Sequence, residues 1–178
     1  VDIVRHLPDD QRELVRVDLA SALYGSKKGN IVLSDRDEIT IEPLKAFPVI
    51  KDLVVDFSKA WDVYVPRFQP AAEKGFWKLE EEEIEEVREL RKCIECFICH
   101  DVCHVIRDHK AEYIGPMFVV KAVALDKHPK DTHKKRYQLL EEKGIWKCNI
   151  SRCCQENCPE KIRITDDAII YAKEKSMD

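Results

Sequence analysis

The sequence predicts an α+β protein in which a short mixed N-terminal region precedes an all-α domain. Three observations lead to this fold class. Residues 39–43 alternate apolar and polar side chains, as a half-buried strand does. From residue 79 onward, apolar residues recur at helical spacing, with proline and glycine between the segments. All eight cysteines lie between Cys93 and Cys158, inside that helical part.

The N-terminal region, residues 1–64, contains the weaker signals. Pro8 and Asp9 can open a first helix, which Gly25 can close. Apolar side chains at near-helical spacing predict a second, amphipathic helix after the strand. The elements expected in this region are a helix over 11–24, a strand over 39–43 and a helix over 48–64. Two prolines and a glycine then mark residues 65–78 as a linker.

The remaining residues, 79–178, predict a helical domain. Its first helix has acids toward its start and bases toward its end, which suits the helix dipole. Pro129 separates the next two helices, Gly144 ends the second of them, and Thr165 can cap the last. Helices are therefore expected over residues 79–92, 115–127, 131–142 and 164–175.

Composition excludes several classes of function. The net charge of −4 offers no basic footprint for nucleic acid, so we expect no nucleic-acid partner. The best apolar run, MFVVKAVAL, has nine residues and contains Lys121, which is too short for a membrane span. Two tight cysteine clusters without a secretory signal favour metal binding over disulfides.

The first cysteine cluster has the spacing C-x2-C-x2-C-x3-C, formed by Cys93, Cys96, Cys99 and Cys103. A tetrahedral zinc site usually draws two ligands from one loop and two from another. Three thiols in one tight loop therefore favour an iron–sulfur cluster, with zinc or disulfides as the alternatives. In the known run of this spacing, the fourth cysteine ligates a second cluster.

The second cysteine cluster supplies the complement and ends in Cys158–Pro159. By the same crossing, Cys158 is expected to complete the first cluster with Cys93, Cys96 and Cys99. A second cluster is left with Cys103, Cys148 and Cys154. Three ligands suit a [3Fe-4S] cluster, because Ser151 stands where a fourth thiol is wanted and a hydroxyl is a poor iron ligand beside thiolates.

Cys153 and the nearby histidines are less informative. Cys153 neighbours Cys154, so we expect its side chain to point away from the second cluster and to act as a small buried apolar group; the alternative is a fourth ligand. His100, His104 and His109 are expected to be solvated or structurally bonded. His104, beside Cys103, is the best candidate for tuning a cluster or moving a proton.

Both cysteine clusters, together with ITIEPLKAFPVIKDLVVDFS upstream, resemble the iron–sulfur subunit of succinate dehydrogenase/fumarate reductase from about residue 39 to the end. The resemblance implies that residues 1–64 are a remnant of a ferredoxin-like β-grasp domain and that residues 79–178 form an α-helical ferredoxin-type domain. It also implies a [4Fe-4S] cluster on Cys93, Cys96, Cys99 and Cys158, and a [3Fe-4S] cluster on Cys103, Cys148 and Cys154.

Two features depart from the family pattern. No cysteine precedes Cys93, so the [2Fe-2S] cluster expected from the family has no ligands in this chain. Cys103 is followed by His104 where the family usually has proline, which resembles a less common branch.

The resemblance further implies an electron-transfer subunit of an oxidoreductase complex, with no catalytic residue of its own. Its expected partners are an FAD-containing subunit that oxidises or reduces a dicarboxylate and a membrane anchor subunit with a quinone site. The chain would then be peripheral, on the cytoplasmic side of the cell membrane. The alternatives are a subunit of a heterodisulfide reductase-type complex and a zinc-stapled interaction module.

Overall fold

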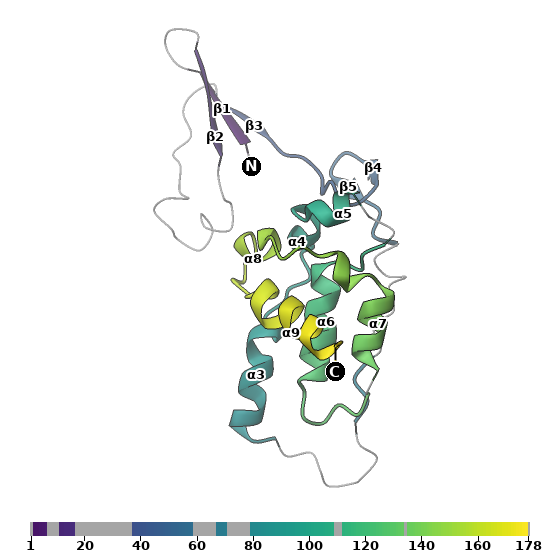
Figure 1. Ribbon diagram of the computed structural model, residues 1–178. Coiled ribbons are helices and arrows are strands. Elements are labelled where there is room, and N and C mark those ends of the chain that lie inside the picture. Colours follow the sequence, from purple (N-terminus) through teal and green to yellow (C-terminus); the bar gives the residue numbers. More distant parts are fainter. Residues whose placement is uncertain are drawn as a thin grey trace. The chain divides into compact units, whose positions relative to one another are not determined.

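The computed structural model describes residues 2–6, 11–16, 37–58, 67–70, 79–108, 112–133 and 135–177. Its chain divides into two compact units, Val1–Asp56 and Phe57–Asp178 (Figure 1). Among the described residues, the elements of the first unit are strands and the named elements of the second are helical; the second unit contains all eight cysteines. The predicted mixture of helix and small sheet is therefore present.

The first unit contains a three-stranded antiparallel sheet with the order β2-β1-β3. Arg5 of β1 forms an ion pair with Asp37, just before β3, at 2.9 Å. A separate hairpin turns at Asp52, whose φ is 52°. The strands are β1 (Asp2–His6), β2 (Arg12–Arg16), β3 (Glu38–Thr40), β4 (Val49–Lys51) and β5 (Val54–Val55).

Two helices predicted in this unit are wrong where the structure describes them. Residues 12–16 form a strand, because pairing with β1 overrides the local helical preference. Residues 49–55 form the hairpin, where β-branched Val49, Ile50, Val54 and Val55 suit strands better than a helix. Of the other residues in the two predicted helices, four are in neither strand nor helix and Ser58 is helical, while residues 17–24 and 59–64 lie outside the described residues. The predicted strand over 39–43 is confirmed only in part, by β3.

The second unit is arranged around one central helix, α6, which contacts α3, α4, α7 and the C-terminal helical segment (Figure 1). Most of the side chains of α6 are buried, including Met117, Val119 and Val123. The elements are α3 (Glu81–Arg91), α4 (Ile98–Asp101), α5 (His104–Asp108), α6 (Pro116–Asp126), α7 (Arg136–Glu142), the 3₁₀ turn η1 (Ile145–Lys147), α8 (Cys153–Glu156), the π-helix η2 (Ile164–Ile170) and α9 (Tyr171–Lys175).

Local chemistry explains how the helix leading to the first cysteines begins. The Glu80 backbone N–H donates to the Glu83 carboxylate at 2.9 Å, as part of a capping box. Acidic residues in the first turn of α3 and basic residues in its last turn suit the helix dipole. Helix α3 then buries Val87 and Leu90 and ends directly before Cys93. The predicted helices over 79–92 and 115–127 are confirmed by α3 and α6.

A buried ion pair determines where α7 begins. Arg136 and Asp131 lie 2.7 Å apart, with side chains at most 1% exposed. Asp131 also accepts from the Gln69 backbone N–H at 2.9 Å, and Arg136 donates to the Arg67 carbonyl at 3.1 Å. Helix α7 thus starts later than predicted because Asp131 is used for this contact. Residues 67–70, inside the predicted linker 65–78, are held against this ion pair by the two hydrogen bonds. The linker and domain assignments stay predictions.

The C-terminal helical segment covers the predicted residues, 164–175, as η2 and α9, but the predicted cap is wrong. Thr165 is not a cap: it is buried inside η2, which starts at Ile164 and continues into α9. Its hydroxyl instead lies 3.5 Å from the sulfur of Cys154. This segment therefore packs directly against one of the predicted ligands.

Candidate metal centre

The two cysteine loops have the same backbone pattern. We call residues 93–103 the first loop and residues 148–158 the second loop. In each loop, the third and fifth residues have left-handed backbone, and a four-residue helix follows. In the first loop these are Glu95 (φ 59°) and Phe97 (φ 59°), followed by α4. In the second loop they are Ile150 (φ 62°) and Arg152 (φ 63°), followed by α8. Left-handed backbone costs a non-glycine residue roughly 1–2 kcal/mol, so a conformation repeated at four such positions indicates a functional shape.

The shared pattern aligns the two loops residue by residue. The pairs are Cys93 with Cys148, Cys96 with Ser151, Cys99 with Cys154 and Cys103 with Cys158. Ser151 therefore occupies the second loop's equivalent of a cysteine. Its hydroxyl donates to the sulfur of Cys153 at 3.4 Å.

A single pocket brings together three thiols of the first loop and one of the second. Its lining includes Cys93, Cys96, Cys99 and Cys158. Apart from Glu160, the rest of the lining is apolar and comes from the first loop, from α6 and from the chain after Cys158: Ile94, Phe97, Met117, Val120, Pro159, Ile162 and Ile164. The pocket is therefore a low-dielectric site in which four sulfurs are grouped.

The remaining four cysteines form a second group. Burial raises the pKa of the Cys103 thiol, and the nearby charges of Cys153 and Cys148 raise it further. Burial raises the pKa of Cys154 to about 12, and its charged neighbours are Cys153, Cys148 and Cys103. The fourth cysteine of each loop thus lies with the other loop's first and third cysteines, the crossed arrangement expected from the sequence.

The two groups are neighbours. Helices α4 and α8 are in contact, and Cys154 is the charged group that most affects Cys99. Burial is the largest cause that raises the pKa of the Cys99 thiol, and it also raises that of Cys93. Such thiols keep their protons until a metal displaces them. The site is thus suited to metal rather than to acid–base chemistry.

The cysteine side chains do not converge on a single point. A zinc ion binds four donors at about 2.0–2.3 Å. In the part of the chain that the structure describes, no three His, Cys, Asp or Glu side chains surround one point closely enough for that. Four of the thiols, those of Cys93, Cys96, Cys99 and Cys158, instead line one pocket.

Each loop also caps a later helix through the residue that follows its third cysteine. His100 Nε2 accepts from the Met117 backbone N–H at 3.3 Å, at the start of α6. Gln155 Oε1 accepts from the backbone N–H groups of Thr165 and Asp166, at 3.0 and 3.2 Å, at the start of η2. Burial lowers the pKa of His100 to about 4, so its ring is neutral and can accept. The loops are thereby fixed to the helices that line the site.

Gly115 is required by the His100 cap. Its φ is 97°, and a Cβ there would lie 2.3 Å from Cε1 of the His100 ring. Only glycine permits both this backbone and this approach. The sequence YIGPM therefore encodes how α6 meets the first loop.

The structure also describes the secondary candidates. His104 Nε2 lies 2.9 Å from the Asn149 amide nitrogen, which links the ends of the two loops. Sequence analysis did not single out Asn149, although it directly follows Cys148. Cys153 is half-buried among the second group, whereas the sequence led us to expect a side chain pointing away. His109 lies outside the described residues.

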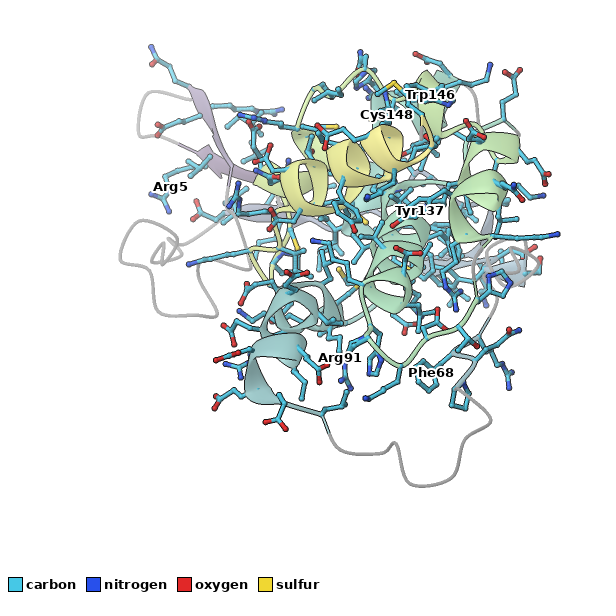
Figure 2. The ribbon with its side chains drawn as sticks, turned by 60° about the horizontal axis from the view of Figure 1, so that its bottom comes forward. Arg5, Phe68, Arg91, Tyr137, Trp146 and Cys148 are labelled. Carbon is cyan, nitrogen blue, oxygen red and sulfur yellow. The ribbon has the colours of Figure 1, made fainter. Side chains whose placement is uncertain are left out.

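One residue near the second group was missed entirely. Tyr113 is 4% exposed, and burial followed by the charges of Cys148, Cys103 and Cys154 raises the pKa of its hydroxyl well above the ordinary value. Only its position, before the Gly115–Pro116 pair, could have suggested it. Trp146, expected to shield the loop, is 47% exposed and lies near Cys148 (Figure 2).

Comparison with known proteins agrees with this site. The model of the 4Fe-4S dicluster domain matches residues 89–162. One subunit of the CoM/CoB fumarate reductase of Methanothermobacter marburgensis is 34% identical over 79% of this chain and 29% of its own length. The succinate dehydrogenase iron–sulfur subunit of Bacillus subtilis is 27% identical over 71% of this chain and 53% of its own length.

A solved structure extends the likeness to the fold. A chain of the Mycobacterium smegmatis Sdh1 complex in the apo form superposes with a TM-score of 0.71 at 42% identity, over 77% of this chain and 60% of that one. This chain is related to the iron–sulfur subunits of succinate dehydrogenase and fumarate reductase.

The similarity to these iron–sulfur subunits covers only part of their length. The chain spans about half, or less, of the curated relatives it matches. Those relatives are named as subunits of oxidoreductases. Among the residues that the structure describes, no helix is long and apolar enough to cross a membrane.

Proposed function

We propose that this chain is the electron-transfer subunit of a succinate:quinone oxidoreductase or fumarate reductase complex. It would relay electrons between an FAD-containing subunit and a quinone site on a membrane anchor subunit. The observation that supports this best is the pair of adjacent thiol groups, each assembled from both loops. A relay needs two centres close together, and Cys99 of the first thiol group is a neighbour of Cys154 of the second.

The first centre is a [4Fe-4S] cluster on Cys93, Cys96, Cys99 and Cys158. The grouping of these four thiols around one apolar pocket supports the assignment. The second centre is a [3Fe-4S] cluster on Cys103, Cys148 and Cys154. Its support is Ser151, which stands at the second loop's equivalent of Cys96. The matching family is named for two 4Fe-4S clusters, so this difference is a specific feature proposed for this chain.

Such clusters supply one-electron redox chemistry when bound, and the protein determines their potentials by burial and hydrogen bonds. Phe97, Met117 and Val120 exclude water from the first group. His100 and Gln155 hold the loops in position through neutral hydrogen bonds, which do not change charge near neutral pH. Dicarboxylate chemistry is assigned to the flavin subunit, and no residue here is given a catalytic role.

Two features are carried over from the sequence as parts of the proposal. No cysteine precedes Cys93, so this chain is proposed to bind no [2Fe-2S] cluster by itself. The chain is also proposed to be peripheral, on the cytoplasmic side of the cell membrane, through its anchor partner.

A second candidate is a subunit of a heterodisulfide reductase-type complex. The observation in its favour is the name of the M. marburgensis relative, which includes CoM/CoB and no quinone. Co-purification separates the two candidates. A quinone oxidoreductase subunit should bring down a flavoprotein and a membrane anchor, whereas the alternative should bring down no quinone-binding anchor.

The test of the relay itself is an iron count on the chain of residues 1–178. We expect about seven irons and eight sulfides, the sum of a [4Fe-4S] and a [3Fe-4S] cluster, with two distinct paramagnetic signals and no [2Fe-2S] signal. The isolated chain should not oxidise succinate. Colourless protein with bound zinc, or succinate oxidation by the chain alone with an artificial acceptor, would overturn the proposal.

A further inference from the structure

Tyr113 presents a buried hydroxyl beside the second cysteine group. The residue is 4% exposed, and among the described residues no acceptor lies in ordinary hydrogen-bond geometry with its buried hydroxyl; the sulfur of Cys148 is within reach of a weaker hydrogen bond. A buried hydroxyl without a good partner loses the hydrogen bonds that it makes with water in the unfolded chain. A phenylalanine would fill the same space without that cost. The hydroxyl therefore requires an explanation at this position.

The backbone around Tyr113 holds it next to Cys148. The Ile114 N–H donates to the Lys143 carbonyl at 2.9 Å, and Glu112 forms an ion pair with Lys147. Both contacts join the Tyr113 segment to the turn that leads into Cys148. A Cβ on Gly144 in that turn would collide with the Glu112 carbonyl, so the two segments are closely packed. Contacts of the residues before and after Tyr113 thus hold its backbone beside the turn that leads to Cys148.

The ionisable neighbours that would raise the pKa of the hydroxyl, after burial, are all cysteines of one group: Cys148, Cys103 and Cys154. Cys148 is the strongest of the three. A thiolate ligand is a good hydrogen-bond acceptor, whereas a protonated thiol is a weak one. The hydroxyl therefore gains a good acceptor when Cys148 becomes a metal ligand.

We infer that Tyr113 donates a hydrogen bond to the Cys148 thiolate of the second cluster and thereby raises that cluster's reduction potential. Reduction adds negative charge to the cluster, and a hydrogen bond to a ligand sulfur stabilises the more negative state. Tyr113 is a positioning residue that does not itself react. The second cluster is then easier to reduce than it would be with its thiolate ligands and no hydrogen bond from Tyr113. This inference rests on the proposed function, because it needs the second cluster.

The test is a redox titration of the cluster-loaded chain, followed by electron paramagnetic resonance. Tyr113→Phe should lower the reduction equilibrium constant of the second cluster by up to about tenfold, a shift of about 59 mV to more negative potential for one electron. The first cluster should not change. Tyr137→Phe is the matched control, because the Tyr137 hydroxyl donates to Asp126 instead. It should change neither potential.

A second measurement keeps the test decisive if Tyr113→Phe fails to assemble its cluster. Hyperfine spectra of the wild-type second cluster in H₂O and D₂O should contain a coupled proton that exchanges slowly, as burial of the hydroxyl requires. An unmoved second potential in Tyr113→Phe with both clusters present, or the lack of such a proton, overturns this inference alone. A wild-type chain with no second cluster overturns the proposed function and this inference with it.

Discussion

The first and second cysteine loops share one backbone conformation but differ in the side chains at their ligand positions. Both have left-handed residues at the same positions, and both are continued by a four-residue helix. In both, the residue that follows the third cysteine caps a later helix. The first loop has thiols at all four ligand positions, and the second has Ser151 at one of them. A change of one side chain on a fixed backbone is therefore the simplest way for two neighbouring centres to differ.

The loops also differ in what surrounds them. The first group lines an apolar pocket under α6, with Met117 and Val120 in its wall. The second group has polar neighbours: the hydroxyls of Tyr113 and Thr165, and a spare thiol, Cys153. Since hydrogen bonds and burial both change cluster potentials, the second centre has more means of adjustment. The predictions below test this contrast.

Removing Cys158 should have the largest effect. Cys158→Ser takes one of four ligands from the first group although it lies in the second loop, so the chain should keep about three irons, with the [4Fe-4S] signal lost. Iron analysis and electron paramagnetic resonance measure this. The matched variant Cys103→Ser should do the reverse and spare the first cluster. If Cys158→Ser abolished only the three-iron signal, the crossed ligand sets would be wrong.

Completing the second loop is the next largest change. Ser151→Cys places a thiol at the equivalent of Cys96, on backbone that already has the same shape. The second cluster should become a four-iron cluster, with about eight irons per chain and loss of the three-iron signal. Ser151→Ala is the control and should keep about seven. A Ser151→Cys chain that still contains three irons in its second cluster would contradict the alignment of the two loops.

The sequence predicted the helical unit better than the strand unit, for physical reasons. Helices such as α3 and α6 have local signals, namely a capping box and a Gly–Pro start, that belong to the segment itself. Strand β2 forms only because β1 is available to pair with it. Spacing alone led us to expect the crossed thiol sets, and the grouping of Cys158 with Cys93, Cys96 and Cys99 around one pocket agrees with it, while the ligand assignments stay predictions. The Tyr113 hydroxyl could not be predicted, because its proximity to Cys148 depends on contacts between segments distant in sequence.

The two helix caps should respond differently to acid. His100 has a pKa of about 4 in the fold, below its ordinary value, so the unfolded chain binds the extra proton between about pH 6.5 and 4. Its contribution to stability is complete above about pH 6.5 and is lost as the pH falls toward 4.

His100→Gln copies the cap of the second loop and should remove this slope, which is at most about 1.4 kcal/mol per pH unit. Unfolding by denaturant from pH 7 to 5 measures it, with cluster absorbance followed in parallel. Gln155→Ala, the control, should lower stability equally at every pH. Equal slopes in wild type and His100→Gln would contradict the assignment.

A smaller effect is expected from relieving the left-handed backbone. Ile150 has a φ of 62°, an unfavourable value for a β-branched residue, and its side chain is 40% exposed. Ile150→Gly should stabilise the cluster-loaded chain by roughly 0.5–1 kcal/mol, since relief of roughly 1–2 kcal/mol exceeds the entropic cost of glycine. Glu95→Gly, at the matching position, should gain less, because it loses the ion pair with Lys121. Thermal midpoints at one scan rate would check both, and a loss of stability in Ile150→Gly would show that the loop needs this side chain.

The smallest effect is expected at Cys153. Its thiol lies among the second group, but it follows a left-handed residue and occupies the equivalent of Ile98, which is not a ligand position in the first loop. The Ser151 hydroxyl also donates to its sulfur. Cys153→Ser should therefore leave about seven irons and both signals in place, with at most a small shift in the second potential. If the wild type instead contained eight irons and Cys153→Ser reduced them to seven, Cys153 would be a ligand that the second loop uses in place of Ser151. The two loops would then reach the same cluster by different routes.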